Sequence, residues 1–153
     1  MIPEYIEYMR LAQICQNADN ELTKFLKKID MICEPYFYRA TNSYKGDWEI
    51  RPSCGKELIR RLGYTFEFEN PEQYANPRYF LTREDGEKRE ITNDMYTQVF
   101  GFLHGLYFDV DGELQDINRK VHNLIPFSDK QRIKDILVEE YNKCFPKTQE
   151  QLK

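Results

Sequence analysis

The spacing of apolar residues predicts helices at both ends of the chain and strands between them. Residues 3–16 and 21–34 each place apolar side chains at the i, i+3 and i+4 positions that form one face of a helix. Residues 17–20, of which three are polar, separate the two stripes, and Pro35 ends the second because proline cannot continue a helix. We therefore predict two N-terminal helices.

Shorter patterns occupy the middle of the chain. Residues 36–39 and 48–51 are predicted to be strands on either side of the turn-rich residues 41–47. Ser53 is suited to cap a short helix over residues 54–62, because serine accepts hydrogen bonds from the first free amides of a helix.

Alternation of apolar and polar residues is strictest at residues 64–69, which predicts a half-buried strand. Residues 79–83 and 88–91 flank an Asp85-Gly86 step, and that arrangement is typical of a β-hairpin. We expect these strands to form a small and mostly antiparallel sheet.

Helical spacing returns in the C-terminal half, where stripes cover residues 92–107, 114–124 and 128–144. Residues 109–112 interrupt the first two stripes, and Pro126 ends the second. The predicted architecture is therefore α+β, with two N-terminal helices, a small mostly antiparallel sheet and three C-terminal helices.

Length and composition favour a single α+β domain over residues 1–146, followed by a flexible C-terminal tail at residues 147–153. The chain has 153 residues, of which 41% are hydrophobic and 31% are charged. This is enough apolar material for one core and enough charge to cover it, whereas a second independent core is not expected at this length.

The cysteines and the N-terminus predict a cytoplasmic protein. Four cysteines stand far apart without CxxC spacing, no secretion signal is visible, and no apolar run approaches the roughly 20 residues of a membrane span. Phe, Tyr, Met, Ile, Asn and Lys, which have AT-rich codons, outnumber Gly, Ala, Arg and Pro by 58 to 28. That bias indicates a low-GC bacterium or its phage or mobile element.

Residues 36–64 form a basic aromatic segment in an acidic chain. The segment contains six Lys or Arg and three Asp or Glu, so its charge is +3, whereas the whole chain carries −4 and the remainder −7. Six aromatic rings, including the only Trp, are interleaved with the cations, and such a mixture grips phosphates, carboxylates and flat rings. The candidate ligand- or partner-binding residues are Tyr38, Arg39, Tyr44, Lys45, Trp48, Arg51, Lys56, Arg60 and Arg61.

Ordinary folding is the alternative interpretation of this segment. Trp48 and Tyr36 would then fill the core, and the cations would pair with the acid-rich remainder of the chain. The two interpretations differ in whether the rings and cations lie outward.

Cys54 is the strongest candidate nucleophile, because it stands at the start of a predicted helix with Arg51 and Lys56 nearby, a setting that favours thiolate. Neither His104 nor His122 has a sequence context that would pair it with this cysteine, so a buried structural cysteine is the simpler interpretation. We assign no catalytic residue.

The remaining polar clusters fit common structural roles. The histidines lack zinc-ligand spacing, and the acidic residues 109–113 lack the glycine and glutamate positions of a calcium loop, so no metal or cofactor is expected. We interpret the acidic cluster as a solvated turn with helix-capping carboxylates. Glu67 and Glu69 share one face of a predicted strand, where they suit either acid–base chemistry or simple solvation.

A short stretch resembles the opening of FRG domains. The matching residues are Tyr38-Arg39, then Trp48, Ile50, Pro52 and Ser53, with His104-Gly105 and Asp109 similar to a later motif of that family. Position 40 is Ala where the family has Gly, and the later motif lacks its Pro-Thr-Arg core. The resemblance implies an ADP-ribosyltransferase-like fold in which Arg39 contacts a dinucleotide.

The sequence as a whole favours a non-enzymatic cytoplasmic binding protein over an enzyme. We expect an inhibitor, immunity or regulatory factor that occludes a macromolecular partner, most simply a protein, through aromatic anchors and charge complementarity. The alternative is a nucleotide- or nucleic-acid-binding protein, or a small FRG-like enzyme, that uses residues 36–64. A homodimer is left open, and no membrane partner is expected.

Overall fold

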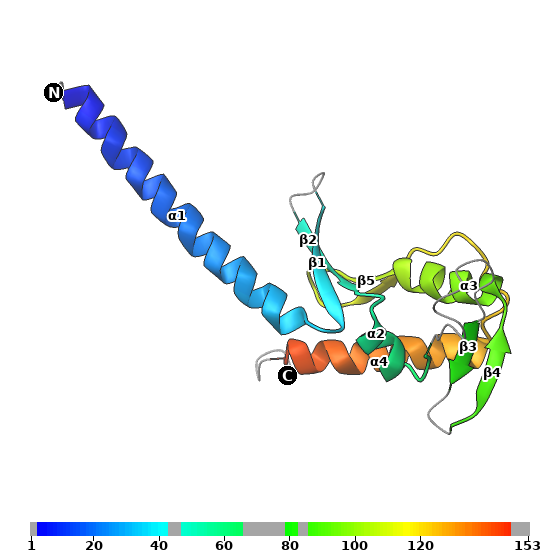
Figure 1. Ribbon diagram of the computed structural model, residues 1–153. Helices are drawn as coiled ribbons and strands as arrows, with labels where there is room; N and C mark the ends of the chain where they lie inside the picture. Colours follow the sequence, from blue (N-terminus) through cyan, green and yellow to red (C-terminus); the bar gives the residue numbers. More distant parts are fainter. Residues whose placement is uncertain (1–2, 43–46, 66–78, 83–85, 148–153) are drawn as a thin grey trace, which may run out of the picture. The chain divides into compact units, whose positions relative to one another are not determined.

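The structure, a computed structural model, combines helices with a small antiparallel sheet and confirms the predicted α+β class (Figure 1). Internal contacts divide the chain into two compact units, residues 1–34 and residues 35–153, which we describe separately. The single domain predicted over residues 1–146 stays a prediction. The residues that the structure describes are 3–42, 47–65, 79–82 and 86–147.

The first unit is one helix, α1 (Pro3–Cys33), so the prediction of two N-terminal helices was wrong. The expected break at residues 17–20 contains neither Pro nor Gly, and its polar residues cost a helix only about 0.7 kcal/mol each. Side-chain amides bridge the break, because Gln13 donates to Asn17 at 3.0 Å and Gln16 donates to Asn20 at 3.3 Å. In the described part of the chain, neither α1 nor any other helix has the length and apolar character that crossing a membrane requires.

The second unit contains a four-stranded antiparallel sheet in the order β1-β2-β5-β6. The β1–β2 hairpin agrees with the strands predicted at 36–39 and 48–51, although both strands are longer than predicted. The strands are β1 (Phe37–Asn42), β2 (Asp47–Pro52), β5 (Leu106–Phe108) and β6 (Leu114–Asp116).

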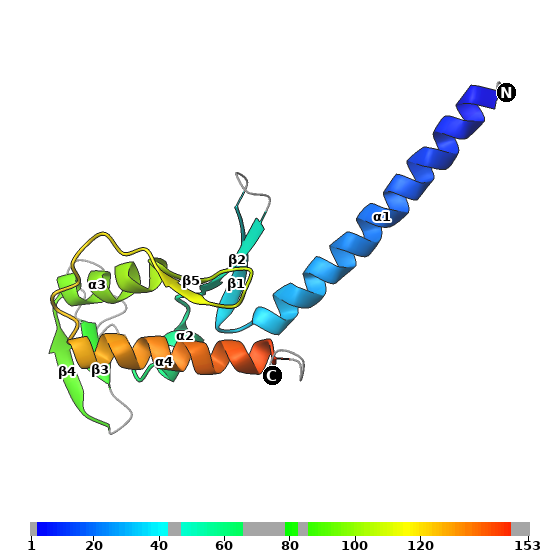
Figure 2. The ribbon, with the colours of Figure 1, turned by 180° about the vertical axis from the view of Figure 1, so that it is seen from behind.

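One face of this sheet packs on the last helix, α4 (Phe127–Cys144), whose C-terminal half lies below β1 and β2 in both ribbon views (Figures 1 and 2). The pairing of Ile50 with Phe108 and the alternation of side chains place these two residues and Phe37 on that face. Tyr141 of α4 stacks on Phe108 with 4.0 Å between ring centroids and meets Phe37 edge-on at 6.3 Å. We call the opposite face of the sheet the outer face.

The second unit also contains two further helices, α2 (Lys56–Arg61) and α3 (Asn93–His104). α2 is shorter than the predicted helix over 54–62. Its C-cap is Leu62, and the next residue, Gly63, has a φ of 86° that glycine adopts without strain. Thr92 caps α3 by accepting a hydrogen bond from the Met95 amide at 3.4 Å. Both helices contribute to a core that includes Leu58, Ile59, Val99, Leu103, Ile133 and Leu137.

The predicted helix over residues 114–124 is absent, since residues 114–116 form β6 and the described residues 117–126 contain neither helix nor strand. Its apolar stripe is not a buried face, because Ile117 is 54% exposed and Val121 is 74% exposed. Gly112 with φ of 79° allows the tight turn that folds β6 back on β5. The described residues of the C-terminal half therefore form two helices, α3 and α4, instead of three.

A separate two-stranded sheet pairs β3 (Tyr79–Thr82) with β4 (Lys88–Ile91) and confirms the predicted hairpin. The strand predicted over 64–69 lies mostly outside the described residues, and its first two residues are in neither a helix nor a strand. Tyr64 is fully buried, where its hydroxyl donates a hydrogen bond of 2.9 Å to Asp129 of α4.

Candidate functional site

The basic aromatic segment is divided by the fold between two faces of the β1–β2 hairpin and the helix α2. Tyr38 is paired with Arg51 across the hairpin, and Thr41 is paired with Trp48. Because successive residues of a strand point to opposite faces, Tyr38 and Arg51 lie on the outer face, whereas Arg39 and Trp48 lie on the face that also carries the core. The predicted site is therefore not one continuous surface.

Four residues come together on the outer face, and we call them the outer-face cluster: Tyr38, Glu49, Arg51 and Tyr107. Glu49 Oε2 accepts hydrogen bonds from Arg51 Nε at 2.9 Å and from Arg51 Nη2 at 2.7 Å. The guanidinium carbon of Arg51 lies 5.9 Å from the centroid of the Tyr107 ring on the neighbouring strand β5. The Glu49 carboxylate and the Tyr107 ring together hold the Arg51 guanidinium in one position on the outer face of the sheet.

Exposure and charge of this cluster suit contact with a partner. Tyr38 is 44% exposed, and the Arg51 side chain retains 33% of its accessible surface. The hydrogen bonds from Glu49 raise the pKa of Arg51 above its usual value against the opposing effect of burial, and Tyr38 adds a smaller contribution. Arg51 therefore stays charged while Glu49 balances its charge, so the cluster offers polar contacts with little net charge.

Arg39 and Trp48 form a second pair near the turn of the hairpin. The Arg39 guanidinium carbon lies 5.8 Å from the centroid of the Trp48 ring, and both side chains are half-buried. Trp48 is thus neither sealed in the core nor fully exposed. Two other predicted site residues, Tyr44 and Lys45, lie outside the described residues.

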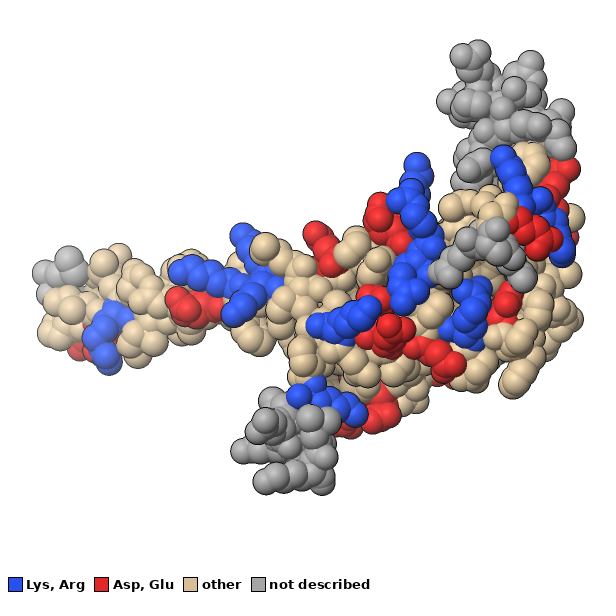
Figure 3. Space-filling model, turned by 90° about the horizontal axis from the view of Figure 1, so that it is seen from below, with Lys and Arg blue, Asp and Glu red and all other residues tan. Residues whose placement is uncertain are grey.

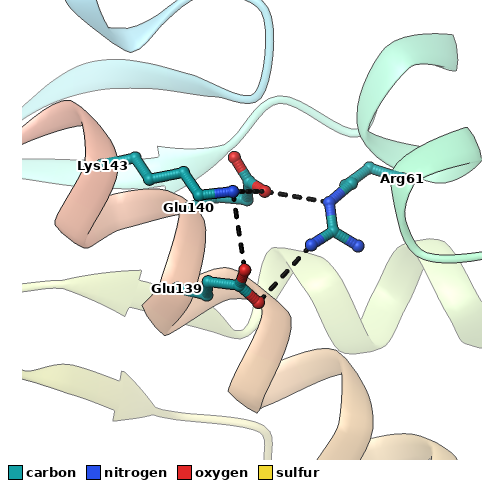
Figure 4. A network of polar contacts seen from close by, with 4 residues as sticks. All are labelled: Arg61, Glu139, Glu140 and Lys143. Atoms are coloured by element: carbon teal, nitrogen blue, oxygen red, sulfur yellow. Dashed lines mark hydrogen bonds and ion pairs between the residues drawn. The ribbon is translucent and has the colours of Figure 1, made fainter.

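Arg61 belongs to the fold rather than to an exposed surface. Its Nε donates to Glu140 Oε1 at 2.9 Å, and its Nη2 lies 3.5 Å from Glu139 Oε2, so that it joins α2 to α4 (Figure 4). Lys143 approaches the same two carboxylates, at 3.3 Å from Glu140 and 3.5 Å from Glu139. For Arg61, the ordinary-folding interpretation fits.

The two remaining cations, Lys56 and Arg60, are exposed on α2. Arg60 Nη1 lies 3.9 Å from Glu57 Oε2, a separation at which an exposed ion pair adds little stability. Basic and acidic side chains alternate on the face that Figure 3 shows, instead of gathering into one basic area. That face therefore gives little support to a phosphate-binding surface.

Cys54 lies in a setting that opposes thiolate formation. α2 begins two residues later, at Lys56, and burial raises the pKa of the Cys54 thiol to about 11. Its backbone has φ of 54°, in the left-handed region that non-glycine residues seldom adopt. At neutral pH the thiol stays protonated, which fits the structural interpretation and not the nucleophilic one.

The histidines and the acidic cluster occupy structural positions. His122 is buried, and its Nε2 lies 3.1 Å from Asn118 Oδ1, while His104 is exposed at the end of α3. Burial lowers the pKa of His122, and Lys130 contributes in the same direction. Within the described ranges, no three His, Cys, Asp or Glu side chains gather as metal ligands would.

Asp109 forms a turn between two strands, not between helices as predicted. Its Oδ1 accepts hydrogen bonds from the amides of Asp111 at 3.0 Å and Glu113 at 2.9 Å, and its Oδ2 accepts one from Gln115 at 2.9 Å. The bond from Glu113 is the main reason why the pKa of Asp109 is lowered. The candidate pair Glu67 and Glu69 lies outside the described residues.

Two hollows in the second unit are lined by described residues, and neither of these includes the basic aromatic segment. One of about 300 Å³ lies beside Tyr141 and Phe145, and one of about 210 Å³ lies beside His122 and Lys130. Small-molecule sites in proteins usually measure about 300 to 1,000 Å³. The hollows therefore do not point to a nucleotide site that uses the predicted residues.

Glu49 and Tyr107 were not among the predicted site residues. Glu49 stands two residues before Arg51, and this i, i+2 spacing on a strand is the signal for a shared face. Tyr107 was assigned to the end of a helix, although the buried, half-buried, buried pattern at 106–108 is that of a strand. No family model, curated protein or solved structure matches the chain in the comparisons with known proteins.

Proposed function

We propose that this chain is a non-enzymatic binding protein that acts as an inhibitor, immunity or regulatory factor by covering a functional surface of a protein partner. The observation that carries the proposal is the outer-face cluster, in which Tyr38, Arg51 and Tyr107 share one face of a sheet. Tyrosine and arginine are the residue types on which the energy of protein interfaces is most often concentrated.

The fixed position of Arg51 supports this function. Its guanidinium has two hydrogen bonds to Glu49 and a ring beside it, so few of its rotamers remain to be lost on binding. A side chain that is already ordered contributes more of its contact energy to affinity. Tyr38, on the adjacent strand, adds exposed ring surface and a hydroxyl beside it.

The charge balance of the cluster favours a protein partner over a polyphosphate. Binding to phosphates relies on several uncompensated cations, whereas Arg51 is neutralised by Glu49 and Arg61 by Glu140. A protein interface instead uses aromatic and guanidinium groups with a balanced rim of charge.

Affinity capture followed by reconstitution tests the proposal. The wild-type chain, Tyr38→Ala and Arg51→Ala serve as baits, and any protein retained by the wild type is purified and titrated against each. We expect a stoichiometric complex whose dissociation constant rises about tenfold or more in both variants. Phe127→Ala is the matched control, since Phe127 is an 83% exposed ring outside the cluster and its loss should leave binding unchanged.

A second experiment, thermal unfolding with added ligands, tests the alternative function. Nucleotides and oligonucleotides are added to the purified chain, and its melting temperature is measured. A ligand-specific stabilisation that disappears in Arg39→Ala would replace the proposal by a nucleotide-binding function. A protein complex that persists in both Tyr38→Ala and Arg51→Ala would show that the outer-face cluster is not the contact surface.

A further inference from the structure

α1 carries a seven-residue repeat of apolar residues along its length. Between Tyr8 and Ile32, all eight residues at the first (a) and fourth (d) positions of the repeat are apolar, compared with five of the other 17. This is the pattern of a helix that packs lengthwise on another helix. The a positions are Tyr8, Cys15, Leu22 and Ile29, and the d positions are Leu11, Ala18, Phe25 and Ile32; we call these eight residues the α1 seam.

The α1 seam is too apolar for a helix that acts alone. Leu11 is 49% exposed and Leu22 is 55% exposed, and a single helix has no second element in its own unit against which to bury them. Helices in proteins are stabilised chiefly by packing an apolar face, and two neighbouring helices related by symmetry are the simplest way to cover a repeat of this kind.

We propose that α1 packs against α1 of a second copy of this chain in an antiparallel pair. In an antiparallel pair, each a residue meets a d residue of the other helix. One register aligns the two helices almost end to end: Tyr8 meets Phe25 of the second copy, Leu11 meets Leu22, and Cys15 meets Ala18. Symmetry repeats each layer, so the seam residues from Tyr8 to Phe25 form six layers along two helices that are each about 45 Å long. Ile29 and Ile32, which are already half-buried within one chain, lie beyond these layers.

Charges beside the seam select this register. The seventh (g) positions of the repeat are Glu7, Ile14, Glu21 and Lys28, and in antiparallel pairs g residues face g residues. The register above places Glu7 opposite Lys28 of the second copy, at both ends of the pair. It also places Ile14 opposite Glu21, so no like charges face each other.

Other arrangements lose this complementarity. Moving one helix by a heptad in either direction places Glu21 opposite Glu21 or opposite Glu7 of the second copy, and like charges at such positions are destabilising. A parallel pair in register would place Glu7 beside Ala12 and Lys28 beside Cys33, with no opposite charges together. The antiparallel register alone among these joins opposite charges without joining like ones.

The sizes of the seam residues agree with the same register. The two central layers each join the small side chains of Cys15 and Ala18, whereas the layers on either side join two leucines and the outermost layers join two aromatic rings. Each layer of this register therefore joins two side chains of similar size. The pairing concerns the first unit and does not depend on the proposed function, which concerns the outer-face cluster.

Charge reversal in the full chain tests the pairing. Glu7→Lys and Lys28→Glu should each weaken the dimer about tenfold in sedimentation equilibrium at low salt, because two attractive contacts become repulsive. The double variant Glu7→Lys/Lys28→Glu should recover wild-type affinity to within about threefold. Its recovery excludes a local cause, since both Glu7→Lys and the double variant lack the ion pair of Glu7 with Arg10.

Lys27→Glu is the matched control for this series. It makes the same charge change at the residue beside Lys28, which lies away from the seam in the helix. We expect its dissociation constant to stay within about threefold of wild type. A wild-type chain that is monomeric at high concentration, or a double variant as weak as the single ones, would overturn the proposal.

Cross-linking tests the direction of the pair. In Glu7→Cys/Lys28→Cys, a short bifunctional maleimide should join residue 7 of one copy to residue 28 of the other, whereas the corresponding single variants should give only the wild-type background from native cysteines. Peptide mapping by mass spectrometry identifies the joined residues. A dimer that instead joins residue 7 to residue 7 and residue 28 to residue 28, with no link between positions 7 and 28, is parallel and contradicts the proposal.

Discussion

The two halves of the basic aromatic segment have similar residues and different roles. In the second half, Arg61 and Tyr64 bond to acids of α4 that are 79 and 65 residues away in the sequence. In the first half, Arg51 bonds to Glu49, two residues away on the same strand. Long-range bonds hold α2 and Tyr64 against α4, whereas the local bond only orders a side chain on the outer face.

This difference shows that a local excess of positive charge does not define a surface. The segment carries +3 and the remainder −7, and part of that imbalance is resolved by contacts between α2 and α4. Arg61 is therefore explained by folding. Tyr38 and Arg51 remain candidates for binding, because the bond between Arg51 and Glu49 is local and does not join separate elements of the fold.

The largest effect should come from Arg61→Ala. It leaves Glu140, which is only 6% exposed, with Lys143 as its remaining cation, and we expect the free energy of unfolding to fall by about 2 kcal/mol. Arg60→Ala is the matched control, because Arg60 is one residue earlier with an exposed partner at 3.9 Å, and it should cost less than about 0.5 kcal/mol. Urea unfolding measures the loss in free energy of unfolding for both variants. Equal losses would show that Arg61 contributes no more to the fold than the exposed Arg60.

The next effect should come from Tyr64→Phe, which removes the buried hydrogen bond to Asp129 while keeping the ring. We expect a loss of about 1 to 2 kcal/mol in the free energy of unfolding. Asp129 retains Arg132, whose Nε lies 3.9 Å from its carboxylate. Urea unfolding at pH 7 measures the loss, and a neutral result would show that the bond adds nothing to the fold.

The same bond predicts how stability changes in alkali. Burial, and then the bond to Asp129, raise the pKa of Tyr64 from 10.0 to about 12, so the folded chain holds this proton more tightly than the unfolded chain. The contribution is complete below pH 10 and is lost as the pH rises toward 12. Urea unfolding between pH 9 and 11 should show a steeper fall for wild type than for Tyr64→Phe, and parallel curves would contradict this assignment.

Much of the fold could be predicted because local patterns agreed with the final packing. The β1–β2 and β3–β4 hairpins, α3 and α4 all follow their periodicity, and Gly63 ends α2 as its residue type suggests. Two errors came from treating weak signals as decisive. Three polar residues among 17–20 were taken as a break in α1, and Leu114, Ile117 and Val121 were taken as a helix although Gly112 turns the chain into a strand.

The candidate site was harder to predict because it depends on contacts between distant parts of the chain. The alternation of the hairpin shows that Tyr38 and Arg51 can share a face, yet nothing local indicates that Tyr107 joins them from β5. Nor does α2 reveal that Arg61 faces Glu140 while Arg60 faces solvent. Tertiary packing therefore determines which carboxylate each of these arginines pairs with.

The smallest effect on stability should come from Arg51→Ala. Its bonds to Glu49 are local and partly exposed, so their formation orders two side chains on one strand without joining elements of the fold. A double-mutant cycle with Glu49→Ala should give a coupling below about 1 kcal/mol in urea unfolding. A coupling as large as the cost of Arg61→Ala would mean that the outer-face cluster also holds the sheet together. The same arginine would then be explained by folding, and the distinction between the two halves of the segment would disappear.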